Sequence, residues 1–144
     1  MSGGMELYLH MPFCVRKCAY CDFLSFPSGA ETQRMYAKRL MEDIDVMGKR
    51  YGEIPVETIF IGGGTPSVPD SGLIVEIMEH VRHAFHVADG AEISMEANPG
   101  TVTREKLTDY RKAGINRLSF GLQSANDREL KLLGRIHTWA EFLE

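Results

Sequence analysis

The chain has 144 residues and a formal charge of −4, with 44% hydrophobic and 25% charged residues, which is the composition of an ordinary globular protein. It has no apolar run long enough to span a membrane, no secretory pattern at its start and no cluster of Lys and Arg. Membrane, secreted and nucleic-acid-binding proteins are therefore disfavoured, and we expect one cytoplasmic domain over residues 1–144.

Four strand-like segments alternate with helix-like segments along the chain. Alternating side chains predict strands over residues 6–11, 57–61, 92–97 and 115–122. Apolar residues at helical spacing predict helices over residues 32–51, 73–85, 104–113 and 127–133. Gly114 and Gly134 follow the last two helices, where glycine commonly ends a helix. Strands joined by helical crossovers predict an α/β fold with a parallel sheet.

The predicted strands carry polar residues on one side only. One side holds Tyr8, His10, Ser94, Glu96, Asn98, Arg117, Ser119, Gly121 and Gln123. The other holds Leu7, Leu9, Met11, Ile59, Ile61, Ile93, Met95, Leu118, Phe120 and Leu122. A sheet with helices on both sides is apolar on both. A single apolar side instead predicts a barrel-like sheet whose polar interior holds a ligand.

The last residues predict the beginning of another helix. Thr138 and Glu141 have the spacing of a capping box, in which each residue satisfies a backbone N–H of the other. Four βα units followed by a helix start are typical of the front part of a larger barrel. We therefore expect a truncated barrel with an unpaired sheet edge after the fourth strand.

Three cysteines, Cys14, Cys18 and Cys21, follow the first predicted strand with the spacing C-x3-C-x2-C. An odd number of thiols packed this closely is a poor disulfide framework and favours metal ligation. Closed iron–sulfur clusters use four cysteines, so three would leave one iron open to a ligand. Arg16 and Lys17 favour the thiolate form. Two alternatives stay open: a zinc site with His10 as fourth ligand, and three buried structural thiols.

The cysteine spacing, with Tyr20 before the last cysteine, resembles that of the radical S-adenosylmethionine (SAM) superfamily. The resemblance implies a [4Fe-4S] cluster on the three cysteines, with the open iron binding SAM and SAM cleavage giving a 5′-deoxyadenosyl radical. It also implies a partial (βα)6 TIM-like barrel. This chain would hold about four of its βα units, as the N-terminal portion of a radical SAM core.

Four further blocks, at residues 60–67, 92–100, 117–124 and 133–138, follow the cysteine motif. The glycines of the first block favour a close backbone approach to a ligand and exposed N–H groups. All five blocks in this order resemble the branch of radical SAM proteins that contains the coproporphyrinogen III dehydrogenases and the HemW heme chaperone family, whose members are also described as oxygen-independent coproporphyrinogen III oxidase-like. The resemblance implies SAM contacts from Tyr8, Tyr20, Gly63, Gly64, Thr65, Glu96, Gln123 and Arg135.

Within this branch, the dehydrogenases carry a further cysteine two residues after the last cluster ligand, where this chain has Phe23. That difference favours a HemW-like chaperone that binds the cluster and SAM and passes heme to an acceptor protein. The alternatives are an oxygen-independent coproporphyrinogen III dehydrogenase, which performs an oxidative decarboxylation, and an inactive truncated fragment. The family's heme-binding motif lies beyond residue 144, so no heme ligand and no catalytic residue can be named, and neither His10 nor His137 is singled out.

Overall fold

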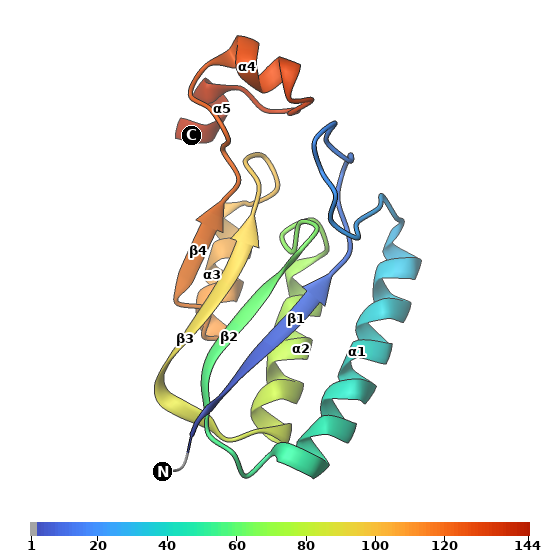
Figure 1. The fold of residues 1–144 in the computed structure, drawn as a ribbon, viewed down its shortest axis with the longest axis vertical. Coiled ribbons are helices and arrows are strands. Elements are labelled where there is room, and N and C mark those ends of the chain that lie inside the picture. Colours follow the sequence, from blue (N-terminus) through green and yellow to red (C-terminus); the bar gives the residue numbers. More distant parts are fainter. Residues whose placement is uncertain (1–2) are drawn as a thin grey trace.

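The computed structural model describes residues 3–144 and forms one four-stranded parallel sheet with the strand order β1-β2-β3-β4. The strands are β1 (Met5–Met11), β2 (Val56–Gly63), β3 (Val87–Ala97) and β4 (Arg117–Phe120), and the helices are α1 (Ala30–Tyr51), α2 (Ser71–Ala84), α3 (Arg104–Lys112), α4 (Asp127–Leu132) and α5 (Trp139–Leu143). Strands and helices alternate through α3, which confirms the predicted α/β fold (Figure 1).

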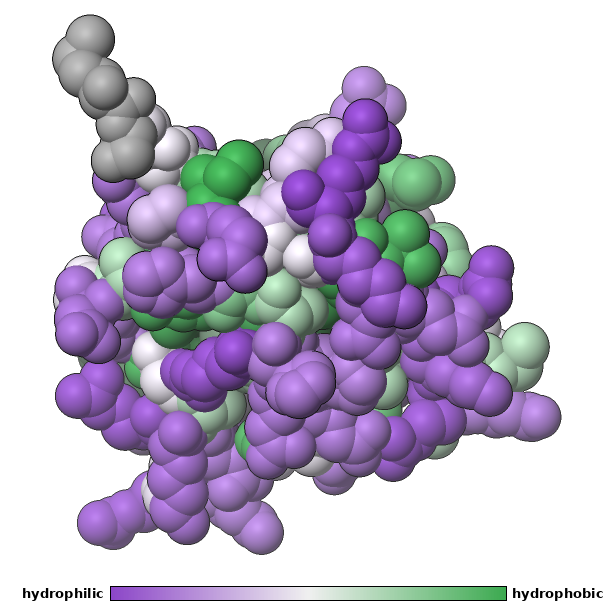
Figure 2. All heavy atoms as spheres, turned by 90° about the horizontal axis from the view of Figure 1, so that it is seen from below, coloured by the Kyte–Doolittle hydropathy of each residue, from purple (hydrophilic) through white to green (hydrophobic). Residues whose placement is uncertain are grey.

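Helices α1, α2 and α3 cover one side of the sheet, and the core lies between these two layers (Figure 1). The strands contribute to it the aliphatic set Leu9, Met11, Ile59, Ile61, Ile93 and Met95. Burying a side chain of this size stabilises the fold by about 1.5–3 kcal/mol. Seen from the end near the N-terminus, the surface is mostly hydrophilic with recessed hydrophobic side chains (Figure 2).

The other side of the sheet is not covered by these helices. Tyr8 is 58% exposed there and stacks on Phe60, its partner in the β1–β2 register, at a ring separation of 6.1 Å. Glu96 pairs with Ser119 in the β3–β4 register, so both lie on this open side. The predicted polar and apolar sides are therefore correctly separated, except at the end of β4, where Leu122 lies beyond the strand and outside the core. Phe120 is 37% exposed because β4 ends there, and its ring packs against Phe142 instead of the core.

The predicted strand boundaries differ from the observed ones by one or two residues, except at the start of β3, which lies five residues earlier than predicted. β3 begins at Val87 because Val87 already pairs with Val56. The register then shifts across residues 88–91, and regular pairing resumes with Glu92 opposite Thr58. β4 begins only at Arg117. Just before it, Asn116 N donates to Ile93 O at 3.0 Å, and the side chain of Asn116 adds two hydrogen bonds to β3 by accepting from Ile93 N and donating to Ala91 O, both at 2.9 Å. These local departures leave the strand order unchanged.

The predicted helix ends are confirmed. Gly114 and Gly134 have φ values of 91° and 76°, the left-handed conformation that glycine adopts without strain. Thr138 and Glu141 form the expected capping box at the start of α5. In the part of the chain from residue 3 onward, no helix is both long and apolar enough to cross a bilayer.

Candidate functional site

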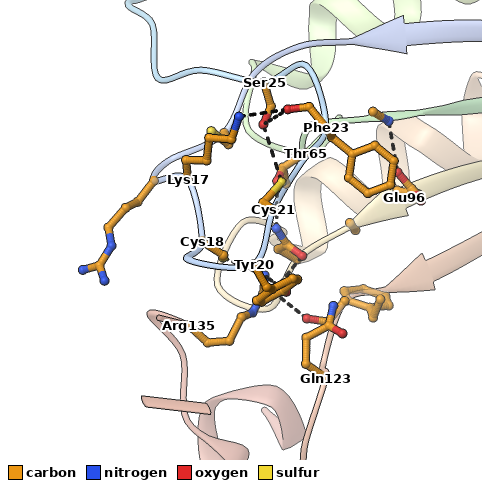
Figure 3. Close-up of a pocket in the computed structure, with 18 of the residues that line it drawn as sticks. Lys17, Cys18, Tyr20, Cys21, Phe23, Ser25, Thr65, Glu96, Gln123 and Arg135 are labelled. Carbon is orange, nitrogen blue, oxygen red and sulfur yellow. Dashed lines mark hydrogen bonds between the residues drawn. The ribbon is translucent and has the colours of Figure 1, made fainter. Parts of the chain in front are cut away.

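The carboxyl ends of the strands and the segment between β1 and α1, residues 12–29, enclose a pocket of about 290 Å³ (Figure 3). We call this segment the cysteine loop. The pocket is lined by Cys14, Cys18, Cys21, Tyr20, Gly63, Gly64, Thr65, Glu96, Gln123 and Arg135, together with nine other residues. Of the predicted site residues, only Tyr8 is not in its lining; it lies on the open side of the sheet.

The three cysteines are free thiols that line this one pocket. Cys14 is buried, while Cys18 and Cys21 are half-buried. Within residues 3–144, no three His, Cys, Asp or Glu side chains meet closely enough to hold one metal ion. A cubane cluster takes each thiolate on a different iron, so its ligands surround it instead of meeting at one point. Three thiols that line one pocket without meeting at one point are compatible with such a cluster.

His10, the fourth ligand in the zinc alternative, is committed elsewhere. Its Nε2 lies 3.0 Å from Leu24 O, which can only accept, so Nε2 carries the proton. The Nδ1 atom then accepts from the Tyr8 hydroxyl at 3.1 Å. Both ring nitrogens are thus used, and His10 is not among the residues that line the pocket. The position of His10 gives the zinc alternative no support.

The cysteine loop is closed at its base by backbone hydrogen bonds. Phe26 N donates to Pro12 O at 2.8 Å, and Cys14 N donates to Phe26 O at 3.3 Å. The Phe13 ring, which is fully buried, packs edge-on against Phe26 and Tyr36. Higher in the loop, Lys17 Nζ donates to Phe23 O at 3.1 Å. The buried base fixes where Cys14 begins the ligand-bearing turn.

The glycine run after β2 uses its N–H groups within the chain. Gly63 N donates to Glu96 Oε2 at 3.1 Å, Gly64 N to Met11 O at 2.7 Å and Thr65 N to Phe13 O at 2.5 Å. The expectation of exposed N–H donors at this run is therefore wrong. These bonds join the end of β2 to Glu96 on β3 and to the base of the cysteine loop.

Glu96 lies at the carboxyl end of β3 and lines the pocket. Its carboxylate fixes Gly63 and also acts on Tyr8. Desolvation, and then the negative charge of Glu96, raise the pKa of Tyr8 above its usual value of 10.0. The Tyr8 hydroxyl therefore stays protonated and donates to His10. Glu96 is a partly buried carboxylate in the pocket, not a solvated charge on a strand edge.

Arg135 joins three segments around the pocket. Its Nη2 donates to Asn98 Oδ1 at 2.9 Å and to Gly121 O at 2.5 Å. Its Nη1 lies 3.4 Å from both Cys18 Sγ and the Tyr20 hydroxyl. Desolvation raises the pKa of Tyr20, and the charge of Arg135 opposes that rise. The Nε atom is buried without a hydrogen-bond partner in the described part of the chain.

Gln123 is exposed and has a φ of 71°. It is the only non-glycine with positive φ in residues 3–144. Such a backbone conformation costs about 1–3 kcal/mol and is concentrated at functional sites. The turn it makes brings its side chain to the pocket after the chain leaves β4 (Figure 3).

Several residues that support the pocket were not predicted as site residues. Asn98 Nδ2 donates to the hydroxyl of Thr65 at 2.7 Å, and the hydroxyls of Ser67 and Thr101 form a short hydrogen bond. Lys106 Nζ donates to Ser67 O at 2.7 Å and to three further carbonyl oxygens, which joins the loops after β2 and β3. Asn98 lies two residues after Glu96 on the predicted polar side, so the alternation of side chains indicated that it faces the site. No sequence pattern indicated the contacts of Lys106.

His137 predicts a pH dependence of stability. Burial, followed by the charge of Arg135, lowers the pKa of His137 below 6.5, and its Nε2–H donates to Leu122 O at 3.3 Å. As the pH falls from the unfolded pKa of His137 toward its lower folded pKa, the unfolded chain binds more protons than the folded chain. Lower pH therefore favours the unfolded state. We expect the free energy of unfolding to decrease as the pH falls below about 6.5.

Urea unfolding at pH 7.5, 6.5 and 5.5 measures this effect. His137→Gln, which keeps a donor for Leu122 O, should flatten the dependence, while His83→Gln, at an exposed position on α2, should not. Equal slopes for His137→Gln and the wild type would show that His137 does not cause the pH dependence.

Comparison with known proteins gives matches along nearly the whole chain. The profile of the radical SAM superfamily matches residues 8–144. The heme chaperone HemW of Escherichia coli is 45% identical over 134 residues, which cover 92% of this chain and 35% of that protein. HemW of Haemophilus influenzae is 40% identical over 142 residues, covering 95% of this chain and 37% of that protein. The chain thus spans about a third of the length of these curated relatives.

Among solved structures, the coproporphyrinogen III oxidase HemN of Escherichia coli, described as a radical SAM enzyme, superposes with a TM-score of 0.86 at 28% identity. The match covers 97% of this chain and 32% of that chain. The four-stranded arrangement is therefore that of part of a radical SAM fold.

Proposed function

The chain belongs to the radical SAM superfamily, and from this premise we propose that Cys14, Cys18 and Cys21 hold a [4Fe-4S] cluster whose open iron binds SAM. The observation that carries the proposal is the convergence of three free thiols on one pocket at the carboxyl ends of the strands. When bound, the reduced cluster supplies the electron that cleaves SAM. The chain's own residues bind the two cofactors and orient them.

The remaining pocket residues have the chemistry to hold SAM. The methionyl amino group carries N–H donors and needs acceptors, which the backbone carbonyls of Gly63 and Gly64 in the pocket lining can offer. The methionyl carboxylate is negatively charged, and the Arg135 guanidinium in the pocket lining places a positive charge near it. The Glu96 carboxylate accepts hydrogen bonds from ribose hydroxyls, while Tyr20 and Gln123 close the sides of the pocket. Tyr8 lies on the open side of the sheet and donates a hydrogen bond to His10, which in turn donates to Leu24 O in the cysteine loop.

Glu96→Gln should weaken SAM binding. The amide keeps an acceptor for Gly63 N but lacks the charge, and a hydrogen bond to a charged group contributes about 1.5–3 kcal/mol. We expect the Kd for SAM to rise about tenfold to hundredfold. Isothermal titration of the anaerobic cluster-loaded chain measures the Kd.

Glu92→Gln is the matched control. Glu92 also lies on β3 and on the open side, but it pairs with Arg117 outside the pocket. Its substitution should leave the Kd for SAM unchanged. An unchanged Kd for Glu96→Gln would remove Glu96 from the SAM site.

We further propose that the protein acts as a heme chaperone, binding heme and transferring it to an acceptor protein. The proposal rests on the similarity to HemW and on Phe23, a side chain that cannot ligate metal, at the position where the dehydrogenases have a further cysteine. Phe23 lines the pocket and is exposed.

Two assays on the same anaerobic preparation separate chaperone from dehydrogenase. In one, heme is added and its absorption is followed, first on the chain and then on a heme-free acceptor. In the other, coproporphyrinogen III, SAM and a reductant are added, and decarboxylated product is measured. We expect heme transfer without decarboxylation. Turnover of coproporphyrinogen III would favour the dehydrogenase. If neither heme transfer nor decarboxylation is observed, both functions are contradicted for this chain.

A further inference from the structure

We propose that Asn98 is a positioning residue that acts through Arg135 to hold a guanidinium N–H against the sulfur of Cys18. The inference rests on the proposed cluster, because Cys18 is one of its three ligands. Its consequence is a cluster whose reduction potential depends on a side chain that is not one of its ligands.

The side chain of Asn98 has one allowed orientation. Its Nδ2–H donates to the Thr65 hydroxyl at 2.7 Å, and its Oδ1 accepts from Arg135 Nη2 at 2.9 Å. Turning the amide over would place Nδ2 against the guanidinium, where two donors would face each other. Thr65 is only 3% exposed, so its hydroxyl has little access to water as a replacement partner.

The surroundings leave room for this arrangement and little else. Gly121 O accepts a second hydrogen bond from Arg135 Nη2 at 2.5 Å. A Cβ on Gly121 would lie 2.5 Å from Asn98 Oδ1 and 3.4 Å from Arg135 Nη2, so any larger residue would displace the pair. With Nη2 fixed by Asn98 and Gly121, the planar guanidinium directs Nη1 toward the cysteine loop.

At the other end of the guanidinium, Nη1 lies 3.4 Å from Cys18 Sγ. An N–H donated to a cluster sulfur withdraws negative charge from the cluster and favours its reduced state. The positive charge of Arg135 acts in the same direction. Losing the Asn98 anchor releases the guanidinium, so reduction of the cluster becomes harder although all three ligands remain.

The test is a redox titration of the cluster-loaded full chain, monitored by the EPR signal of the reduced cluster. Asn98→Ala should shift the midpoint potential to a more negative value, and so should Arg135→Met. Because Asn98 acts through Arg135, adding Asn98→Ala to Arg135→Met should produce no further shift. Asn116→Ala is the matched control, since it also removes an amide with two hydrogen bonds but lies outside the pocket. It should leave the potential unchanged.

An unchanged potential in Asn98→Ala would overturn the proposal. So would an equal shift on adding Asn98→Ala to the wild type and to Arg135→Met. If Asn98→Ala does not assemble the cluster, Thr65→Val removes the acceptor that orients the amide and must shift the potential in the same negative direction, again only when Arg135 is present. Absence of a cluster in the wild-type chain would overturn the proposed function itself. A wild-type cluster with a potential insensitive to both substitutions would overturn only the role of Asn98.

Discussion

Replacing Cys14 by Ser is expected to abolish cluster assembly. After anaerobic reconstitution, the wild-type chain should carry about four irons, and Cys14→Ser should fall to background, because a cubane held by two thiolates would have two irons without a protein ligand. Cys14 is buried at the base of the cysteine loop, so no other thiol can reach its place. Iron and sulfide analysis together with the absorption spectrum measure the loss.

Val15→Ser is the matched control for this substitution. It introduces the same residue one position along the loop, at an exposed side chain. It should keep the iron content and the thermal stability of the wild type. Iron retained by Cys14→Ser, or lost equally in both variants, would contradict the assignment of Cys14 as a ligand.

Gly64→Ala is expected to damage the site without removing a ligand. An added Cβ would overlap Phe13 O and would lie 2.9 Å from both Met11 O and Phe13 N, all of them backbone atoms that cannot move aside cheaply. The base of the cysteine loop must then shift, and the hydrogen bonds from Gly64 N and Thr65 N to it weaken. We expect a loss of about 1–3 kcal/mol in the free energy of unfolding. Cluster occupancy should fall severalfold.

Gly29→Ala provides the comparison. Its added Cβ would have no neighbour within 4 Å, and it lies at the start of α1, away from the pocket. Urea unfolding and iron analysis should both give values close to the wild type. Wild-type stability and iron content in Gly64→Ala would mean that the close backbone approach at Gly64 does not position the cysteine loop.

The fold could be predicted from the sequence because its signals are local. Alternation placed the strands, helical spacing placed the helices, and Gly114 and Gly134 marked helix ends with the positive φ they adopt. The one-sided polarity of the strands predicted an open, ligand-binding side. The predicted start of β3 was wrong because residues 88–91 leave the ladder, which depends on pairing with β2 and not on the residues themselves.

The candidate site was predictable as a set of residues but not as a network. The cysteine spacing and the polar side identified most of the lining residues. The hydrogen bonds of Arg135 to Cys18, which is 117 positions away, and to Asn98 follow from tertiary packing and have no periodic signal. The same is true of Gly64, whose role comes from the backbone of another segment that lies against it.

EPR spectroscopy of the anaerobically reconstituted and reduced chain, with and without SAM, tests most directly whether the three cysteines hold a cluster with an open iron. We predict a reduced [4Fe-4S] signal whose g-values shift when SAM is added, because the amino and carboxylate groups of SAM would bind the open iron. A cluster signal indifferent to SAM would contradict the open iron. The absence of any signal, with zinc bound instead, would contradict the cluster.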